Sequence, residues 1–205
     1  MKRRTHAAQH RERPLRVKTG LFLAILFSAA CAKSQNAPAA QQAQGSVAQA
    51  PATKMEAFRP SAGSVFTLGY DALGKIGLKI SVDVRELRDA KGASARGLLV
   101  EVAESQYRDE TSFVDADEIP ELLKGLDALL AINENPTKFK SFEVRYTTRG
   151  QLELTAFNTN AGAIRYSVKA GRPIGATAFI STADMQSLRG LFDMASQKLA
   201  SLNAK

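Results

Sequence analysis

A repeated segment is the feature of this sequence that most restricts its fold. Residues 113–130 read FVDADEIPELLKGLDALL, and residues 179–195 read FISTADMQSLRGLFDMA. A shift of 66 positions aligns the two segments, so that apolar residues match apolar residues and an aspartate matches an aspartate. The aligned pairs are Phe113 with Phe179, Ile119 with Met185, Leu122 with Leu188, Leu126 with Phe192, and Asp127 with Asp193. Each copy holds a strand end, a polar helix cap and an amphipathic helix. Such a recurrence predicts two tandem copies of one supersecondary unit.

Alternating apolar and polar residues predict strands before each of these helices. The predicted strands are 65–70, 78–84, 98–102 and 111–114 in the first unit, and 142–146, 152–156, 164–168 and 176–180 in the second. The glycines of GYDALGKIG are expected to end the first strand early. Short turns favour antiparallel hairpins. The sequence therefore predicts an α+β domain over residues 55–205, with two tandem pseudo-repeats of about four antiparallel strands followed by one helix.

Both helices begin at polar residues that are suited to capping. Asp115 with Glu118, or Asp117 with Pro120 in the first turn, is expected to cap the first helix. Ser181 with Asp184 is expected to cap the second. Apolar residues at helical spacing form a stripe on each helix: Ile119, Leu122, Leu123, Leu126, Leu129 and Leu130 on the first; Met185, Leu188, Leu191, Phe192, Ala195, Leu199 and Leu202 on the second.

The first 31 residues have the organisation of a secretory signal peptide. Seven basic residues precede the apolar run LFLAILF. Three small residues, SAA, follow the run and precede Cys31. The run is too short for a membrane-spanning helix, which needs about 20 residues, although a membrane anchor or a buried helix is the alternative. Residues 28–31 (SAAC) resemble the lipobox of bacterial lipoproteins except at Ser28, where an aliphatic residue is usual. This resemblance implies lipid attachment at Cys31; the alternative is ordinary cleavage after Ala30 or Ala32.

Residues 32–54 are almost entirely Ala, Gln, Pro, Ser and Gly, a composition that predicts a disordered tether. The whole chain has 28 basic and 20 acidic residues. Residues 1–31 hold seven of the basic residues and one acidic residue, which leaves 21 and 19 in the rest. The basic surplus therefore belongs mainly to the leader, and binding of nucleic acid by the mature chain is not favoured on charge.

The order of elements resembles that of the Whirly family and related single-stranded nucleic-acid binders, which duplicate a unit of four strands and a helix. The phrases FVDADEIPELLKGLDAL, FEVRYTTRGQLELTAFN and FISTADMQSLRGLFDMA also resemble a family of small exported bacterial proteins without an assigned function. The first resemblance implies a polyanion-binding fold. The second implies export and no particular activity.

The residue types present exclude several chemistries. Both histidines, His6 and His10, lie in the leader, and no cysteine follows Cys31. The mature domain therefore lacks the groups for Ser-His-Asp or Cys-His triads, thiol redox chemistry and the usual zinc, copper or haem sites. No glycine-rich phosphate loop is present. No cofactor, no catalytic residue and no metal site is predicted.

Two groups of side chains are candidates for a site. Acidic residues gather near the first helix: Asp109, Glu110, Asp115, Asp117, Glu118 and Glu121. They suit a Ca²⁺ site or, as favoured here, helix caps and charges at a helix N-terminus. Basic residues alternate with apolar ones near Tyr146 and Tyr166: Arg145, Arg149, Arg165, Lys169 and Arg172. They suit a polyanion site or the solvated face of a half-buried sheet.

The sequence thus favours a non-enzymatic exported cell-envelope protein on the periplasmic or extracellular side, anchored to the membrane through a lipid on Cys31, with an envelope protein or glycan as partner. One alternative is a polyanion or single-stranded nucleic-acid binding module. The other is a hydrolase that uses paired carboxylates.

Overall fold

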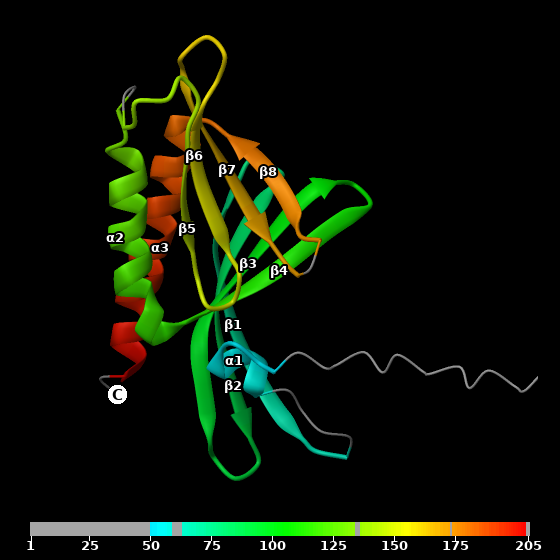
Figure 1. Ribbon diagram of the computed structural model, residues 1–205. Coiled ribbons are helices and arrows are strands. Elements are labelled where there is room, and N and C mark those ends of the chain that lie inside the picture. The colour runs from blue at the N-terminus through cyan, green and yellow to red at the C-terminus, as the bar shows by residue number, and fades with distance from the viewer. Residues whose placement is uncertain (1–49, 59–62, 134–135, 173, 204–205) are drawn as a thin grey trace, which may run out of the picture. The chain divides into compact units, whose positions relative to one another are not determined.

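The computed structural model describes residues 50–58, 63–133, 136–172 and 174–203, all within one compact unit, Val47–Lys205. Two four-stranded antiparallel sheets are each followed by a helix (Figure 1), which confirms the predicted α+β class with tandem repeats. Sheet A holds β1 (Phe66–Ile76), β2 (Ile80–Asp89), β3 (Ser94–Ser105) and β4 (Arg108–Asp115), and α2 (Ile119–Leu130) follows. Sheet B holds β5 (Glu143–Thr147), β6 (Glu153–Asn158), β7 (Ile164–Ala170) and β8 (Ala176–Ile180), and α3 (Thr182–Asn203) follows. Within the described elements, strands are hydrogen-bonded in chain order in both sheets.

The core lies where both sheets meet the two long helices. Alternate residues of β2, β3, β6 and β7 are buried there, as period-2 patterning requires. From the helices, Leu122 and Leu126 of α2 join Leu188 and Phe192 of α3. These are the residues that the 66-position shift aligns, so the repeat supplies equivalent core positions. Figure 1 shows α2 and α3 side by side, and Arg189 of α3 pairs with Asp127 of α2 at 2.9 Å.

β1 is longer than the sequence suggested. It continues through its glycines to Ile76, with an irregularity in its pairing to β2 between Ala72 and Gly74. A Cβ on Gly74 would lie 2.9 Å from Leu191 of α3. Glycine at this position therefore lets the helix approach the strand closely instead of ending the strand.

The folded part of the chain begins at least two residues before position 55. Residues 53 and 54 belong to the folded unit: Thr53 is the N-cap of α1 (Lys54–Ala57), and its side chain and that of Glu56 form a capping box. Met55 is buried, and α1 contacts β3 and β4. The folded unit thus includes residues 53 and 54, because a cap and a buried side chain order them. The predicted leader, Cys31 and residues 32–49 lie outside the described residues.

A short 3-10 turn, η1 (Ala116–Glu118), joins β4 to α2. Among the described residues, none of the helices combines the length and apolar character that crossing a membrane requires.

Candidate binding surface

The acidic residues near α2 do not cap that helix. Asp115 precedes η1 and Glu118 precedes α2, yet neither side chain makes a capping hydrogen bond. Instead, the fully buried carboxylate of Asp115 accepts hydrogen bonds from the backbone N–H groups of Lys54 at 2.9 Å and Met55 at 3.2 Å. The predicted cap is therefore wrong for the first helix, because Asp115 serves the N-terminus of α1, a separate segment. The cap of α3 is confirmed: the Asp184 backbone N–H donates to Ser181 Oγ at 3.2 Å.

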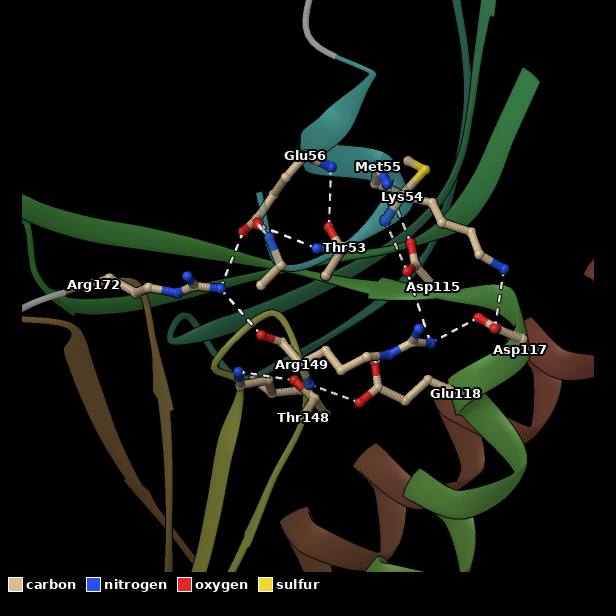
Figure 2. A network of polar contacts seen from close by, with 12 residues as sticks. Thr53, Lys54, Met55, Glu56, Asp115, Asp117, Glu118, Thr148, Arg149 and Arg172 are labelled. Carbon is tan, nitrogen blue, oxygen red and sulfur yellow. Dashed lines mark hydrogen bonds and ion pairs between the residues drawn. The ribbon is translucent and has the colours of Figure 1, made fainter. Parts of the chain in front are cut away.

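Arg149, in the turn between β5 and β6, binds the same acidic cluster (Figure 2). Its guanidinium lies 2.7 Å from Asp117 Oδ1, 3.4 Å from Glu118 Oε2 and 3.7 Å from Asp115 Oδ2. Its backbone N–H donates to Glu118 Oε1 at 2.7 Å. Lys54 Nζ reaches the other side of Asp117 at 3.0 Å. These contacts join α1, the β4–α2 connection and the second repeat.

Arg172 extends the network beyond β7. Its guanidinium donates to the carbonyl oxygen of Arg149 at 3.1 Å and lies 3.5 Å from Glu56 Oε1 (Figure 2). Arg149 and Arg172, which the sequence grouped with a possible polyanion site, are therefore committed to contacts that hold the repeats and α1 together.

The charges of this network do not favour acid catalysis. Hydrogen bonds from Lys54 and then from Arg149 lower the pKa of Asp117, although burial opposes them. A general acid needs the opposite direction, a raised carboxyl pKa. Glu121 pairs with Lys124 at 2.7 Å. Over the part of the chain that the structure describes, no group of three or more Asp, Glu, His or Cys side chains could hold a metal ion.

The remaining predicted bases lie on the outer face of sheet B. The register places Phe157 opposite Arg165, and places Arg145, Thr155, Ser167 and Phe179 in the next row of the same face. Lys169 follows one row further, opposite Glu153. Alternation along the strands therefore brings Arg145, Arg165 and Lys169 to one face, as the sequence predicted.

The aromatic partners on that face are not the ones expected from the sequence. Tyr166 is buried in the core, and Tyr146 packs against Gly125 of α2, so both tyrosines point away from the bases. Phe157 and Phe179 take their place, with ring centroids 6.0 Å apart in an edge-to-face arrangement. Strand alternation could have found them, since Phe157 and Arg165 follow the outward positions of β6 and β7.

A small cavity of about 340 Å³ opens beside these rings. Its lining is Phe157, Arg165, Tyr166, Phe179, Ile180, Ser181 and Asp184. We call five of these residues the Phe179 patch: Phe157, Arg165, Phe179, Ser181 and Asp184. Phe179 is 64% exposed. Side-chain and backbone hydrogen bonds from Ser181 lower the pKa of Asp184, so this carboxylate is anionic at neutral pH. Such a cavity is at the small end for ligand sites and suits one ring or side chain.

The outer face of sheet B carries charges of both signs. Arg145 is paired with Glu143 and lies 3.9 Å from Glu153. Arg165 and Lys169, in contrast, form no ion pair within the described part of the chain. The face therefore presents two available cations beside the exposed ring of Phe179 and the half-buried ring of Phe157, with an anion at Asp184.

The two repeats differ at one pair of residues that the 66-residue shift aligns, Phe113 and Phe179. Phe113 of β4 is half-buried, in the sheet whose strands β3 and β4 contact α1. Its counterpart Phe179 is mostly exposed beside the cavity. The aromatic side chain is therefore more exposed to solvent in the second repeat, at Phe179, than in the first, at Phe113.

A scan against models of protein families gave no match to this chain, and neither did a search of curated proteins.

Proposed function

We propose that this chain is a non-enzymatic exported cell-envelope protein whose duplicated domain binds a partner through the Phe179 patch. The observation that carries this proposal is the exposure of Phe179 beside a cavity lined by Arg165, Ser181 and Asp184. Exposed aromatic side chains next to a few convergent polar groups are typical of recognition surfaces. The absence of histidine and cysteine after Cys31 supports binding over catalysis.

The mixed charge of the patch favours a partner of modest charge, such as a protein segment or a glycan of the envelope. One ring of such a partner fits a cavity of about 340 Å³. Arg165 and Asp184 offer a donor and an acceptor that orient it. The bulk of the contact is then made by the two phenylalanine rings.

Site-specific photo-cross-linking in cells tests this proposal. A photoreactive residue replaces Phe179 in one variant and Met194, which is half-exposed on α3, in the control. We expect one discrete adduct from position 179 that Arg165→Ala weakens, and no such adduct from position 194. The absence of any adduct from position 179, or the same adducts from both positions, would contradict the proposed surface. A purified hydrolytic activity abolished by one carboxylate substitution would contradict the non-enzymatic assignment.

Attachment to the membrane through Cys31 belongs to the same proposal and is tested separately. The residues before Cys31 and its place at the end of the leader support it. Mass spectrometry of the mature N-terminus should show a lipid on Cys31, and Cys31→Ser should release the protein from the membrane fraction. A mature chain that begins at another residue and carries no lipid rules out the anchor.

A second candidate function is binding of a polyanion or single-stranded nucleic acid. Phe157, Phe179 and the available cations Arg165 and Lys169 favour it, since bases stack on aromatic rings while cations track the backbone. The order of elements in this chain, which resembles that of the Whirly family, supports the same function. If Arg165 and Lys169 make the phosphate contacts, the slope of log affinity against log salt should be shallow, about −1.4 for a single strand.

Titration of a labelled oligothymidine at low salt tests this candidate. Replacing Arg165 and Lys169 by Ala should weaken binding and flatten the salt slope. Arg145→Ala is the matched control, because Arg145 is already paired with Glu143. The candidate is rejected if wild type shows no binding at low salt, or if the control loses as much affinity as the double variant.

A further inference from the structure

A second cavity lies beside the Phe179 patch. It measures about 280 Å³ and is lined by Ser141, Phe142, Glu143, Phe157 and Asn158. Phe157 lines the cavity of the Phe179 patch as well, so the two cavities meet at its half-buried ring. Asn158 fixes the chain that leads into β5: its side-chain amide donates to the carbonyl oxygen of Lys140 at 2.7 Å, and its Oδ1 accepts from the backbone N–H of Phe142 at 3.0 Å. These two hydrogen bonds hold one wall of the second cavity in place.

Both cavities lie along one row of residues that crosses sheet B. The register places Glu143 of β5 opposite Phe157 of β6, and Phe157 opposite Arg165 of β7. Ser181, which follows the last residue of β8, continues the row beside Arg165. Neighbouring strands are about 4.8 Å apart, which makes the row from Glu143 to Ser181 about 14 Å long. A ligand that fills both cavities therefore extends over more than one ring.

The row offers a hydrogen-bond donor and a hydrogen-bond acceptor at the same cavity. Ser181 donates from its backbone N–H and from its hydroxyl, and both hydrogen bonds go to Oδ2 of Asp184. The other oxygen, Oδ1, accepts no hydrogen bond from the described residues, and the guanidinium of Arg165 forms no hydrogen bond or ion pair with them. A ligand that displaces water from these groups has to donate to Asp184 and accept from Arg165, because unpaired polar groups in a contact are costly.

We propose that the ligand of this row is a neutral oligosaccharide of at least two sugar rings; this inference rests on the proposed binding function of the Phe179 patch and specifies its partner. A sugar ring has faces of C–H groups and a rim of hydroxyls. Its C–H face packs on the face of a phenylalanine ring, which is electronegative. Each hydroxyl both donates and accepts hydrogen bonds, so neighbouring hydroxyls suit Asp184 and Arg165 together.

Other partners fit the row less well. A polyanion places its negative groups near Asp184 at one end and Glu143 at the other, and like charges repel. A proline-rich segment has no backbone N–H at its prolines to donate to Asp184. Any other peptide that crosses Phe157 brings backbone N–H and C=O groups onto a ring that offers them no hydrogen bond, where they lose their partners in water.

Titration of the isotope-labelled chain with defined sugars, followed by NMR, tests this inference. The neutral probes are chitotetraose, whose rings carry N-acetyl groups, and cellotetraose, whose rings carry only hydroxyls. Each is compared with its monosaccharide and with the acidic chain tetragalacturonate. We expect at least one neutral tetrasaccharide to shift the amide signals of Phe157, Phe179 and Asp184. Its monosaccharide should bind at least about tenfold more weakly, because it fills one cavity and loses the contact in the other.

Substitutions along the row separate binding at the two cavities. Phe179→Ala removes an exposed ring and should weaken binding of the tetrasaccharide about tenfold. Ser141→Leu places a branched side chain in the second cavity. It should abolish the advantage of the tetrasaccharide over the monosaccharide and leave monosaccharide binding unchanged. Tyr107→Ala is the matched control, because Tyr107 is an exposed aromatic residue in the β3–β4 turn of sheet A, and it should leave both affinities unchanged.

The glycan assignment and the proposed function fail on different results. If a photoreactive residue at position 179 gives a discrete adduct but neither neutral tetrasaccharide binds, the patch keeps its binding function and the glycan assignment is wrong. If both experiments are negative, the proposed surface itself is wrong. Tighter binding of tetragalacturonate than of the neutral chains would identify a polyanion as the partner. Equal affinity for one ring and for four rings would overturn the use of both cavities.

Discussion

The buried carboxylate of Asp115 accepts a hydrogen bond from the backbone N–H of Lys54 at 2.9 Å, although 61 positions separate the two residues. A second bond, from the backbone N–H of Met55 at 3.2 Å, completes a two-point attachment of α1 to the end of β4. A helix of four residues has no intrahelical partners for its first N–H groups. An acid from another segment therefore supplies the acceptors, and Met55 is held against sheet A.

Loss of this acceptor should destabilise the domain. Asp115→Ala leaves two N–H groups without partners, one of them in a buried bond, and should lower the free energy of unfolding by about 2–3 kcal/mol. Asp117→Ala removes an exposed partner of Lys54 and Arg149 and should cost less than about 1 kcal/mol. Urea unfolding at neutral pH measures both values. Equal losses in the two variants would mean that Asp115 does not anchor α1.

Even a methyl group at position 125 should lower the stability of the domain. Alanine inside a helix is normally more stable than glycine by about 1 kcal/mol. A Cβ on Gly125 would lie 2.4 Å from the Tyr146 ring, so Gly125→Ala should instead destabilise by about 1–3 kcal/mol. Gly190→Ala in α3 meets no heavy atom within 4 Å and should stabilise by up to about 1 kcal/mol.

A double-variant cycle with Tyr146→Ala tests whether the Tyr146 ring causes the destabilisation by Gly125→Ala. In that background, Gly125→Ala should become neutral or stabilising in thermal or urea unfolding, because the ring that it meets is gone. A penalty at Gly125 that persists without the ring would point to the helix backbone instead.

Equivalent leucines of the two repeats should be equally important to the fold. Leu122 of α2 and Leu188 of α3 are both fully buried in the common core. Leu122→Ala and Leu188→Ala should each lower the free energy of unfolding by about 2–5 kcal/mol. Met194→Ala, at a half-exposed position of α3, should change it by only about 0.5 kcal/mol. Separate unfolding transitions for the two leucine variants would contradict a shared core.

The network around Asp117 should make stability sensitive to acid. Its folded pKa lies below the ordinary value of 3.8, first because of the hydrogen bond from Lys54 and then because of that from Arg149. The contribution of Asp117 is therefore fully present above pH 3.8 and is lost as the pH falls through its folded pKa. Asp117→Asn should be less stable than wild type at neutral pH, and the difference in melting temperature should shrink in acid. A difference that stays constant over the same range would exclude this ionisation as the cause.

Much of the fold could be predicted because it is recorded in local patterns. The period-2 runs located the eight strands, and the helical stripes of α2 and α3 located their buried faces. The cap of α3 was also predictable, since Ser181 and Asp184 are three residues apart. The length of β1 was not, because Gly74 reads as a strand breaker until Leu191 is placed against it.

The candidate surface was predictable only in part. Alternation along the strands placed Arg145, Arg165 and Lys169 on one face. The same pattern does not indicate which basic residues form ion pairs with acidic residues of other elements. Arg149 and Arg172 lie in turns and form ion pairs with residues of α1 and of the β4–α2 connection. Phe157 and Phe179 become a pair only when β6 and β8 lie in one sheet.

The sequence by itself determined that this chain contains two copies of one α+β unit, because hydrophobic periodicity and capping depend on residues within a few positions of each other. It also determined that no imidazole or thiol follows Cys31. The tertiary structure alone decided that Asp115 attaches α1, that Arg149 joins the repeats, and that Phe179 is left exposed beside a cavity. These relationships join side chains that are tens of residues apart, so they exist only after packing has brought their strands and turns together.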